Sequence, residues 1–154
     1  MSLAVYQTCT AIAILVILLI ATYFDCKDGT IPILLFPLLP ALIVPISVIC
    51  GQPEIINSLI GMLIGAATFF ILAIWFEGGG GDILMMGVLG WCLGIRGILI
   101  LILVSSVTYT IFATAVIGVY AMQKRTKEAL RNQYPFAPFV LAGFILCLIF
   151  NWIL

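Results

Sequence analysis

Two aspartates stand where long apolar runs meet short polar stretches, and their type and position make them the residues best suited to chemistry. Asp25 follows the apolar run that ends at Phe24, and Asp82 follows four consecutive glycines. Two carboxylates held close together do not both ionise readily, so one can act as a general base on water while the other acts as an acid. Such a pair needs no metal ion and no cofactor, and the sequence predicts neither.

The glycines before Asp82 are the second chemical feature. Each glycine in a helix is less favourable than alanine by about 1 kcal/mol, so a run of four needs a reason. Glycine removes side chains and permits backbone angles closed to other residues. We therefore predict that Gly79, Gly80 and Gly81 line the path by which an extended peptide reaches Asp82. An ordinary loop is the alternative interpretation.

The composition is that of an integral membrane protein. The chain has 154 residues, of which 65% are hydrophobic and 8% are charged. A soluble domain has about 25% charged residues. The length suits one all-α transmembrane domain over residues 1–154. The formal net charge of zero gives no indication of nucleic-acid binding, and the absence of histidine excludes Ser-His catalysis and His-ligated zinc.

The five cysteines do not indicate a metal site or a redox centre. No two of them have C-x-x-C spacing, which argues against zinc. Four lie in apolar runs and are interpreted as small core residues. Cys26 differs because it lies beside the charged residues that follow Asp25.

Six apolar runs are candidates for membrane-spanning helices, since about 20 apolar residues cross a bilayer. The first has no preceding Lys or Arg and is longer than the core of a signal peptide, so we predict a retained span. The fourth is short for a span and must be tilted or end within protein. The six runs are 4–24, 33–50, 55–76, 83–95, 98–122 and 138–154.

The distribution of Lys and Arg predicts the orientation of these spans in the plasma (inner) membrane. If the first span runs from outside to inside, the inner loops hold five basic residues and the outer loops hold only Arg96. Because cytoplasmic loops are enriched in Lys and Arg, we predict that both termini lie outside. Asp25 and Asp82 then lie on the cytoplasmic side. The polar loop 123–137 is either a connector at the lipid headgroups of the bilayer or an aid to substrate positioning.

Three stretches, in this order, resemble the type IV prepilin peptidases, which are membrane aspartyl proteases that cut the leader from pilin-like precursors. DCKDGTIP matches the family's Asp, five residues and Ile-Pro, which places one catalytic aspartate at Asp25 rather than Asp28. GGGD matches the Gly-x-Gly-Asp motif and places the other at Asp82. PFAPFVLAG, which begins at Pro135, is similar to the family's Pro-Phe-Gly-Pro-Phe segment before the last helix.

The resemblance implies an aspartic endopeptidase that acts at the cytoplasmic membrane face. Its implied partners are prepilin-like precursors (pilins or pseudopilins) of type IV pilus and protein secretion systems. The chain has no N-terminal domain with paired C-x-x-C motifs, so it resembles the short, peptidase-only form without methyltransferase activity. The implied catalytic residues are Asp25 and Asp82, and the implied substrate-binding residues are Gly79, Gly80, Gly81, Pro135, Phe136 and Pro138.

The chain departs from the family pattern at three positions. Ile33 replaces a frequent asparagine after Ile-Pro, and Ala137 replaces the glycine between the two Pro-Phe pairs. Leu84 replaces a lysine that usually stands two residues after the second aspartate. A lysine there would stabilise the carboxylate or hold a substrate group, so Leu84 bears on the pH range and on substrate choice.

Three alternatives compete with this function. A presenilin-like protease shares Gly-x-Gly-Asp but pairs it with Tyr-Asp inside a span, whereas Asp25 follows Phe24. A small transporter or channel subunit would use Asp25 and Asp82 as ion or proton sites, although the chain lacks the internal repeat of many transporters. An inactive secretion-assembly factor is the third, and Leu84 favours it. A cleavage assay with the purified protein and one cognate precursor would settle most of this choice.

Overall fold

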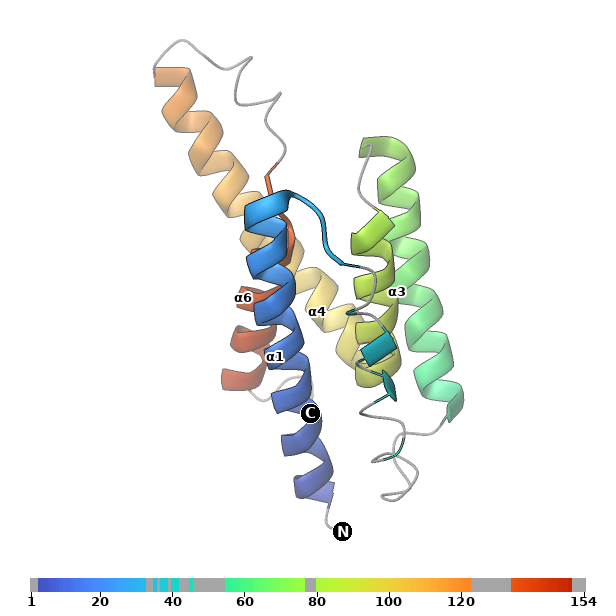
Figure 1. The fold of residues 1–154 in the computed structure, drawn as a ribbon. Helices are drawn as coiled ribbons and strands as arrows, with labels where there is room; N and C mark the ends of the chain where they lie inside the picture. Colours follow the sequence, from blue (N-terminus) through green and yellow to red (C-terminus); the bar gives the residue numbers. More distant parts are fainter. Residues whose placement is uncertain are drawn as a thin grey trace.

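The computed structural model describes residues 3–32, 35, 37–38, 40–41, 45, 55–76, 80–122 and 134–150. Within these ranges it contains four helices: α1 (Leu3–Asp28), α3 (Ile55–Phe76), α4 (Gly80–Met122) and α6 (Ala137–Ile149) (Figure 1). Helices α1, α3 and α4 are long and apolar enough to cross a membrane, and α6 is a shorter apolar helix. The predicted all-α class is confirmed. The bundle of six spans stays a prediction, because the run at 33–50 lies largely outside the described residues.

Helix α1 extends further than the sequence predicted. The first span was expected to end at Phe24, with Asp25 at the start of a loop, but the helix continues through Asp28. Gly29 ends it with a left-handed φ of 63° and donates its N–H to the backbone carbonyl of Asp25 at 3.1 Å. A left-handed glycine is a common helix terminator. Asp25 therefore lies on the last turn of α1, where the helix fixes its position.

Helix α4 consists of two arms. Gly94 alone within it has a non-helical conformation, with φ 67° and ψ −172°. There the chain turns back, so that a first arm (80–94) leads to the turn and a second arm (95–122) leaves it at an angle, back in the direction from which the first arm came (Figure 1). The arms correspond to the predicted runs 83–95 and 98–122. The turn was expected at Arg96-Gly97 but lies at Gly94, a residue type that tolerates this backbone conformation.

The turn at Gly94 is held by a side chain from α3. A helix break leaves backbone donors without their usual partners. The N–H of Ile95 donates to Oδ1 of Asn57 at 3.1 Å. Asn57 thus replaces the hydrogen bond that the break removes, and it fixes the point from which the two arms diverge.

Glycines bring α3 and the first arm of α4 into backbone contact. A Cβ atom added to Gly61 would overlap the carbonyl oxygen of Gly90, and one added to Gly90 would overlap that of Gly61. A Cβ at Gly65 would overlap the carbonyl oxygen of Met86. Small residues four apart let apolar helices approach this closely. The close contact anchors the first arm, which carries Asp82 at its beginning, to α3.

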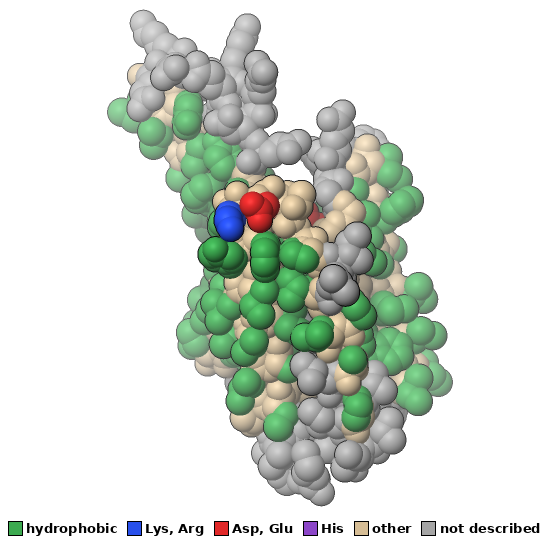
Figure 2. Space-filling model, viewed as in Figure 1, with side chains coloured by type: hydrophobic (Ala, Val, Ile, Leu, Met, Phe, Trp, Pro, Cys, Tyr) green, Lys and Arg blue, Asp and Glu red, His purple; other side chains and the backbone are tan. Residues whose placement is uncertain are grey.

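Helix α6 packs against α1 on one side and against α4 on the other. The buried core draws on α1, both arms of α4 and α6, for example through Leu18, Met86, Leu101 and Phe144. Hydrophobic side chains cover most of the visible face, while the acidic and basic side chains gather toward one end (Figure 2). A broad apolar surface with charges at one end is what a membrane-embedded bundle requires.

The described cysteines agree with their interpretation as core residues, with Cys26 as the predicted exception. Cys92 and Cys147 are buried, and Cys9 is half-buried. Cys26 is exposed on the last turn of α1. Cys50 lies outside the described residues.

Candidate active site

The structure brings Asp25 and Asp82 together at one end of the molecule. Asp25 lies on the last turn of α1, and Asp82 lies in the first turn of α4. These two helix ends occupy the same end of the bundle (Figure 1). The two carboxylates are close enough for their charges to interact unfavourably. Both side chains are partly exposed, so each combines a fixed helix position with access from outside the bundle.

The carboxylate of Asp25 caps helix α6. Its Oδ2 accepts the backbone N–H of Ala137, the first residue of α6, at 2.9 Å. Phe136, at the N-cap position, provides no side-chain hydrogen bond to the helix. The first N–H groups of a helix have no partner within it, and a carboxylate there gains from both the hydrogen bond and the helix dipole. Asp25 is thus held in place by a helix far from it in sequence.

Asp82 also stands at a helix N-terminus, that of α4, where a negative charge interacts favourably with the dipole. Within the described ranges, no hydrogen-bond donor reaches its carboxylate. The two acids therefore differ in environment. Each is stabilised by a helix N-terminus, but among the contacts of the described residues only Asp25 is oriented by a hydrogen bond.

The first two motifs are in contact at this site. Ile31, from the Ile-Pro pair after Asp25, is buried, and it lies 3.5 Å from the position of a Cβ atom built on Gly81. Gly80 is exposed and would have no atom within 4 Å of such a Cβ. Ile31 therefore covers Gly81, whereas the space beside Gly80 is open. Gly79 lies outside the described residues.

An aromatic cluster positions the segment before α6. The ring of Phe136 lies 5.2 Å from that of Phe69 on α3 and 5.6 Å from that of Tyr109 on α4. Phe139 continues the cluster, 5.1 Å from Tyr109 and 5.0 Å from Phe112. Aromatic pairs at such distances contribute beyond their buried area. The cluster fixes the start of α6, and with it the N–H that binds Asp25.

The substrate-binding role of the Pro135, Phe136 and Pro138 segment stays a prediction. All three side chains are partly exposed. Phe136 packs against α3 and α4, so it has a structural role whether or not it contacts substrate. Pro138 occupies the first turn of α6, where its missing N–H is not needed.

The remaining charged residues near the site are more exposed. Asp28 and Lys27 are exposed at the end of α1, and the Lys27 ammonium lies 5.7 Å from the centre of the Tyr23 ring. Leu84 is 45% exposed and adds no charge beside Asp82. Ile33 lies outside the described residues. Among the described side chains, no cluster of three or more His, Cys, Asp or Glu residues forms a candidate metal site.

Sequence reasoning missed the residues that hold the acids in place. Ala137 contributes a backbone N–H, which no side-chain pattern reveals. Asn57 and the glycines of α3 act through helix packing. A signal for the packing was present, since Gly61 and Gly65 are four residues apart, as are Gly90 and Gly94.

The fold and site together define a helical membrane protein with two aspartates paired at one end of its bundle. Residues 12–114 match the model of the type IV leader peptidase family, and the chain belongs to that family. The match covers both aspartates and ends before Pro135. Comparisons with curated proteins and with solved structures gave no significant match.

Proposed function

We propose that the chain is a membrane aspartic endopeptidase that removes the short leader of type IV prepilin-like precursors at the cytoplasmic membrane face. The observation that carries the proposal is the pairing of Asp25 and Asp82, which come from separate helices and interact at one end of the bundle. Membership of the leader peptidase family supports the same activity. A precursor with a basic leader and an apolar segment provides a scissile bond at the membrane surface, the level at which the two acids would lie.

The two environments suggest different roles for the acids. Asp25, whose carboxylate accepts the Ala137 N–H, is the better placed general base, because the hydrogen bond orients the charged form. It would take a proton from water as the water oxygen attacks the scissile carbonyl carbon. Asp82 would hold the shared proton and give it to the carbonyl oxygen. Collapse of the tetrahedral intermediate, with proton transfer to the nitrogen, releases the leader carboxylate and the new amino terminus.

The same placement supports a proposed orientation in the membrane. We propose six spans in the inner membrane, both termini outside and the aspartates at the cytoplasmic face. Helix α6 runs from Asp25 in the direction of the end at which α1 begins, which supports an even number of crossings (Figure 1). Gly79, Gly80, Gly81 and the Pro135–Pro138 segment are proposed to bind the substrate backbone.

The test is cleavage of a cognate precursor by the purified protein in detergent or vesicles. Asp25→Asn and Asp82→Asn are each expected to abolish cleavage, because an amide is neither a general base nor a general acid here. The double variant should be no worse than either single variant, since the acids act as a unit. Asp28 is exposed and lies about one helical turn after Asp25, so Asp28→Asn is the matched control. This variant should keep most of the activity. Activity in Asp25→Asn with none in Asp28→Asn would overturn the assignment.

A further inference from the structure

The peptide group between Phe136 and Ala137 carries the N–H that Asp25 accepts, and its position depends on Phe136. The carbonyl of the same planar group accepts the N–H of Phe139 at 3.0 Å and that of Val140 at 3.3 Å. This peptide group and the first turn of α6 therefore move together. Phe136 makes no side-chain hydrogen bond to the turn, so the contacts of its ring are the described interactions that hold it from outside the helix.

Two rings from other helices hold this turn. Phe69, on α3, is 8% exposed, and its ring centre lies 5.2 Å from that of Phe136. Tyr109, on the second arm of α4, is partly buried, and its ring centre lies 5.6 Å from that of Phe136 and 5.1 Å from that of Phe139. Because Phe136 precedes Ala137 and Phe139 follows it, the two rings support the turn from α3 and from α4.

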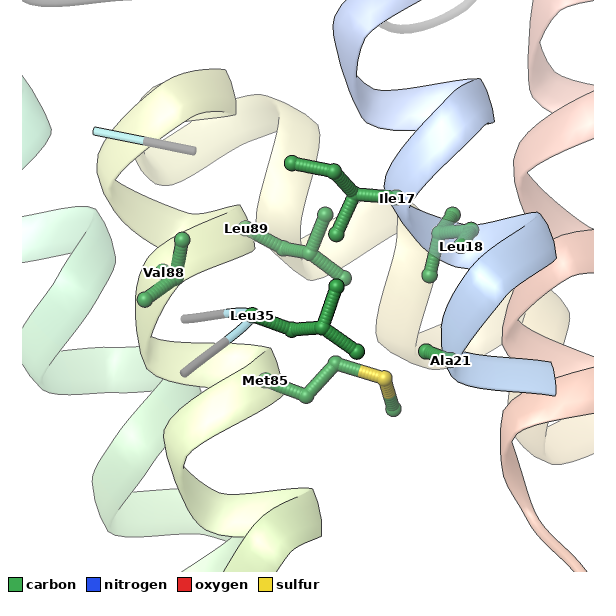
Figure 3. Close-up of a pocket in the computed structure, with 7 residues that line it drawn as sticks. All are labelled: Ile17, Leu18, Ala21, Leu35, Met85, Val88 and Leu89. Carbon is green, nitrogen blue, oxygen red and sulfur yellow. The ribbon is translucent and has the colours of Figure 1, made fainter. Parts of the chain in front are cut away.

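The side chains below Asp25 do not orient its carboxylate. There α1 faces the first arm of α4 through apolar side chains, among them Ala21 on α1 and Met85 and Leu89 on α4 (Figure 3). Such side chains donate no hydrogen bond. Among the described residues, the direction of the Asp25 carboxylate thus depends on the N–H of Ala137.

We propose that Phe69 and Tyr109 are positioning residues for the cleavage reaction, because their rings hold the Phe136–Ala137 peptide group so that its N–H orients the carboxylate of Asp25. The inference rests on the proposed function. The bond of 2.9 Å weakens as its atoms separate or its angle bends. A displacement of about 1 Å at a catalytic group can lower a rate about 100-fold. The two rings therefore act on Asp25 through the start of α6.

The rest of α6 has contacts of its own. A Cβ atom added to Gly143 would overlap Ser105 on the second arm of α4, so the two helices are in close contact at this point. Val140, Phe144 and Cys147 are fully buried along the same helix. Loss of one ring should therefore shift the first turn of α6 while the helix stays in place, and cleavage should fall more than stability.

Cleavage by variants that remove or keep the rings tests the proposal. Phe69→Leu and Tyr109→Leu should each lower kcat about tenfold or more, with a smaller change in KM, because the orientation of the general base matters in the transition state. Tyr109→Phe keeps the ring and should keep the wild-type kcat. Phe70→Leu is the matched control and should cleave like wild type, since Phe70 follows Phe69 on α3 but is 56% exposed.

Three results would overturn the positioning role. Unchanged kcat in both Phe69→Leu and Tyr109→Leu would show that the rings do not affect the general base. A rise in KM alone would mean that they support substrate binding instead. An equal loss of kcat in Tyr109→Phe and Tyr109→Leu would mean that the hydroxyl, and not the ring, is required.

A double-mutant cycle on stability tests the path through Asp25 without any cleavage. Unfolding temperatures are measured in one detergent for Asp25→Ala, Tyr109→Leu and the double variant. If the ring supports the bond to Asp25, the double variant should lose less than the sum of the two single losses. Additive losses would mean that the ring does not act through this bond. If wild type cleaves no precursor, the proposed function and the role in cleavage both fail, while the cycle still shows whether the ring holds the bond.

Discussion

The carboxylate of Asp25 has a proposed catalytic role and a structural one. Its charge interacts with that of Asp82, its proposed catalytic partner, and it caps the start of α6 by accepting the N–H of Ala137. The first role requires a group that can exchange a proton. The second requires only an oxygen that accepts the N–H.

Substitution at Asp25 should therefore give different results for activity and stability. Asp25→Asn keeps an acceptor oxygen, whereas Asp25→Ala removes it. We expect both variants to lose cleavage, with Asp25→Ala less stable than Asp25→Asn by about 1 kcal/mol, the usual loss on removing a helix cap. Cleavage rates and thermal unfolding in detergent measure the two effects. Equal stability of the two variants would show that the hydrogen bond to Ala137 does not stabilise α6.

The glycines before Asp82 make a second prediction at the residue scale. A side chain at Gly80 has open space, and one at Gly81 comes into ordinary contact with Ile31. Neither position demands glycine for packing. Gly80→Val and Gly81→Val are thus expected to fold with a small loss of stability and to lose most of their cleavage activity, because the methyl groups occupy the substrate's path. Precursor cleavage is measured beside the unfolding temperature. Wild-type turnover in both variants would refute the role assigned to these glycines.

At the scale of the elements, the position of Asp82 depends on the contact between α3 and the first arm of α4. At 1.5 Å per residue, the first arm is about 22 Å long, shorter than the roughly 30 Å of a bilayer core. Its backbone contact with α3 at Gly61 and Gly90, together with the Asn57 bond at the turn, holds the arm in register. The contacts with α3 therefore set the position of the first arm, which is too short to be positioned by spanning the bilayer.

This contact predicts opposite effects for two glycines of the same helix. Gly90→Ala places a methyl group on the backbone of Gly61, so the helices must separate, and we expect a loss of a few kcal/mol in stability together with lost cleavage. Gly118→Ala meets no atom within 4 Å and should be neutral or stabilising by up to about 1 kcal/mol through helix propensity. Unfolding of both variants in one detergent gives the comparison. A tolerated Gly90→Ala would mean that α3 and the first arm of α4 are not in backbone contact.

The elements also show which features the sequence could predict. Apolar runs located α3 at 55–76, and the two runs after Asp82 anticipated the two arms, because hydropathy reports membrane burial directly. The ends of the helices were harder to predict from the sequence. The apolar run ends at Phe24, but the backbone stays helical as far as Gly29, which adopts a positive φ. The motifs identified the two aspartates that the fold pairs, whereas the Ala137 N–H reaches Asp25 only because the fold brings α1 and α6 together.

At the scale of the whole molecule, the arrangement of helix ends bears on orientation. The end of α1, the start of α4 and the start of α6 meet at the aspartates, and α6 runs from there in the direction of the start of α1 (Figure 1). The bias of Lys and Arg independently predicts that the loops beside the aspartates face the cytoplasm. The proposed cleavage of precursors before export requires this orientation.

Accessibility measurements in vesicles of known sidedness test the orientation. Cys26 is exposed one residue from Asp25, whereas Cys92 and Cys147 are buried, so Cys26 should report on the face of the active site. We expect a membrane-impermeant thiol reagent to label Cys26 in inside-out but not in right-side-out vesicles, with Cys26→Ser as the control for background labelling. Lys127→Cys in that background should behave in the same way, and protease-sensitive tags on both termini should be removed only in right-side-out vesicles. Removal of the C-terminal tag only in inside-out vesicles would mean an odd number of crossings. The first arm of α4 would then enter and leave the bilayer on one side, since it is the segment too short to cross without help from α3.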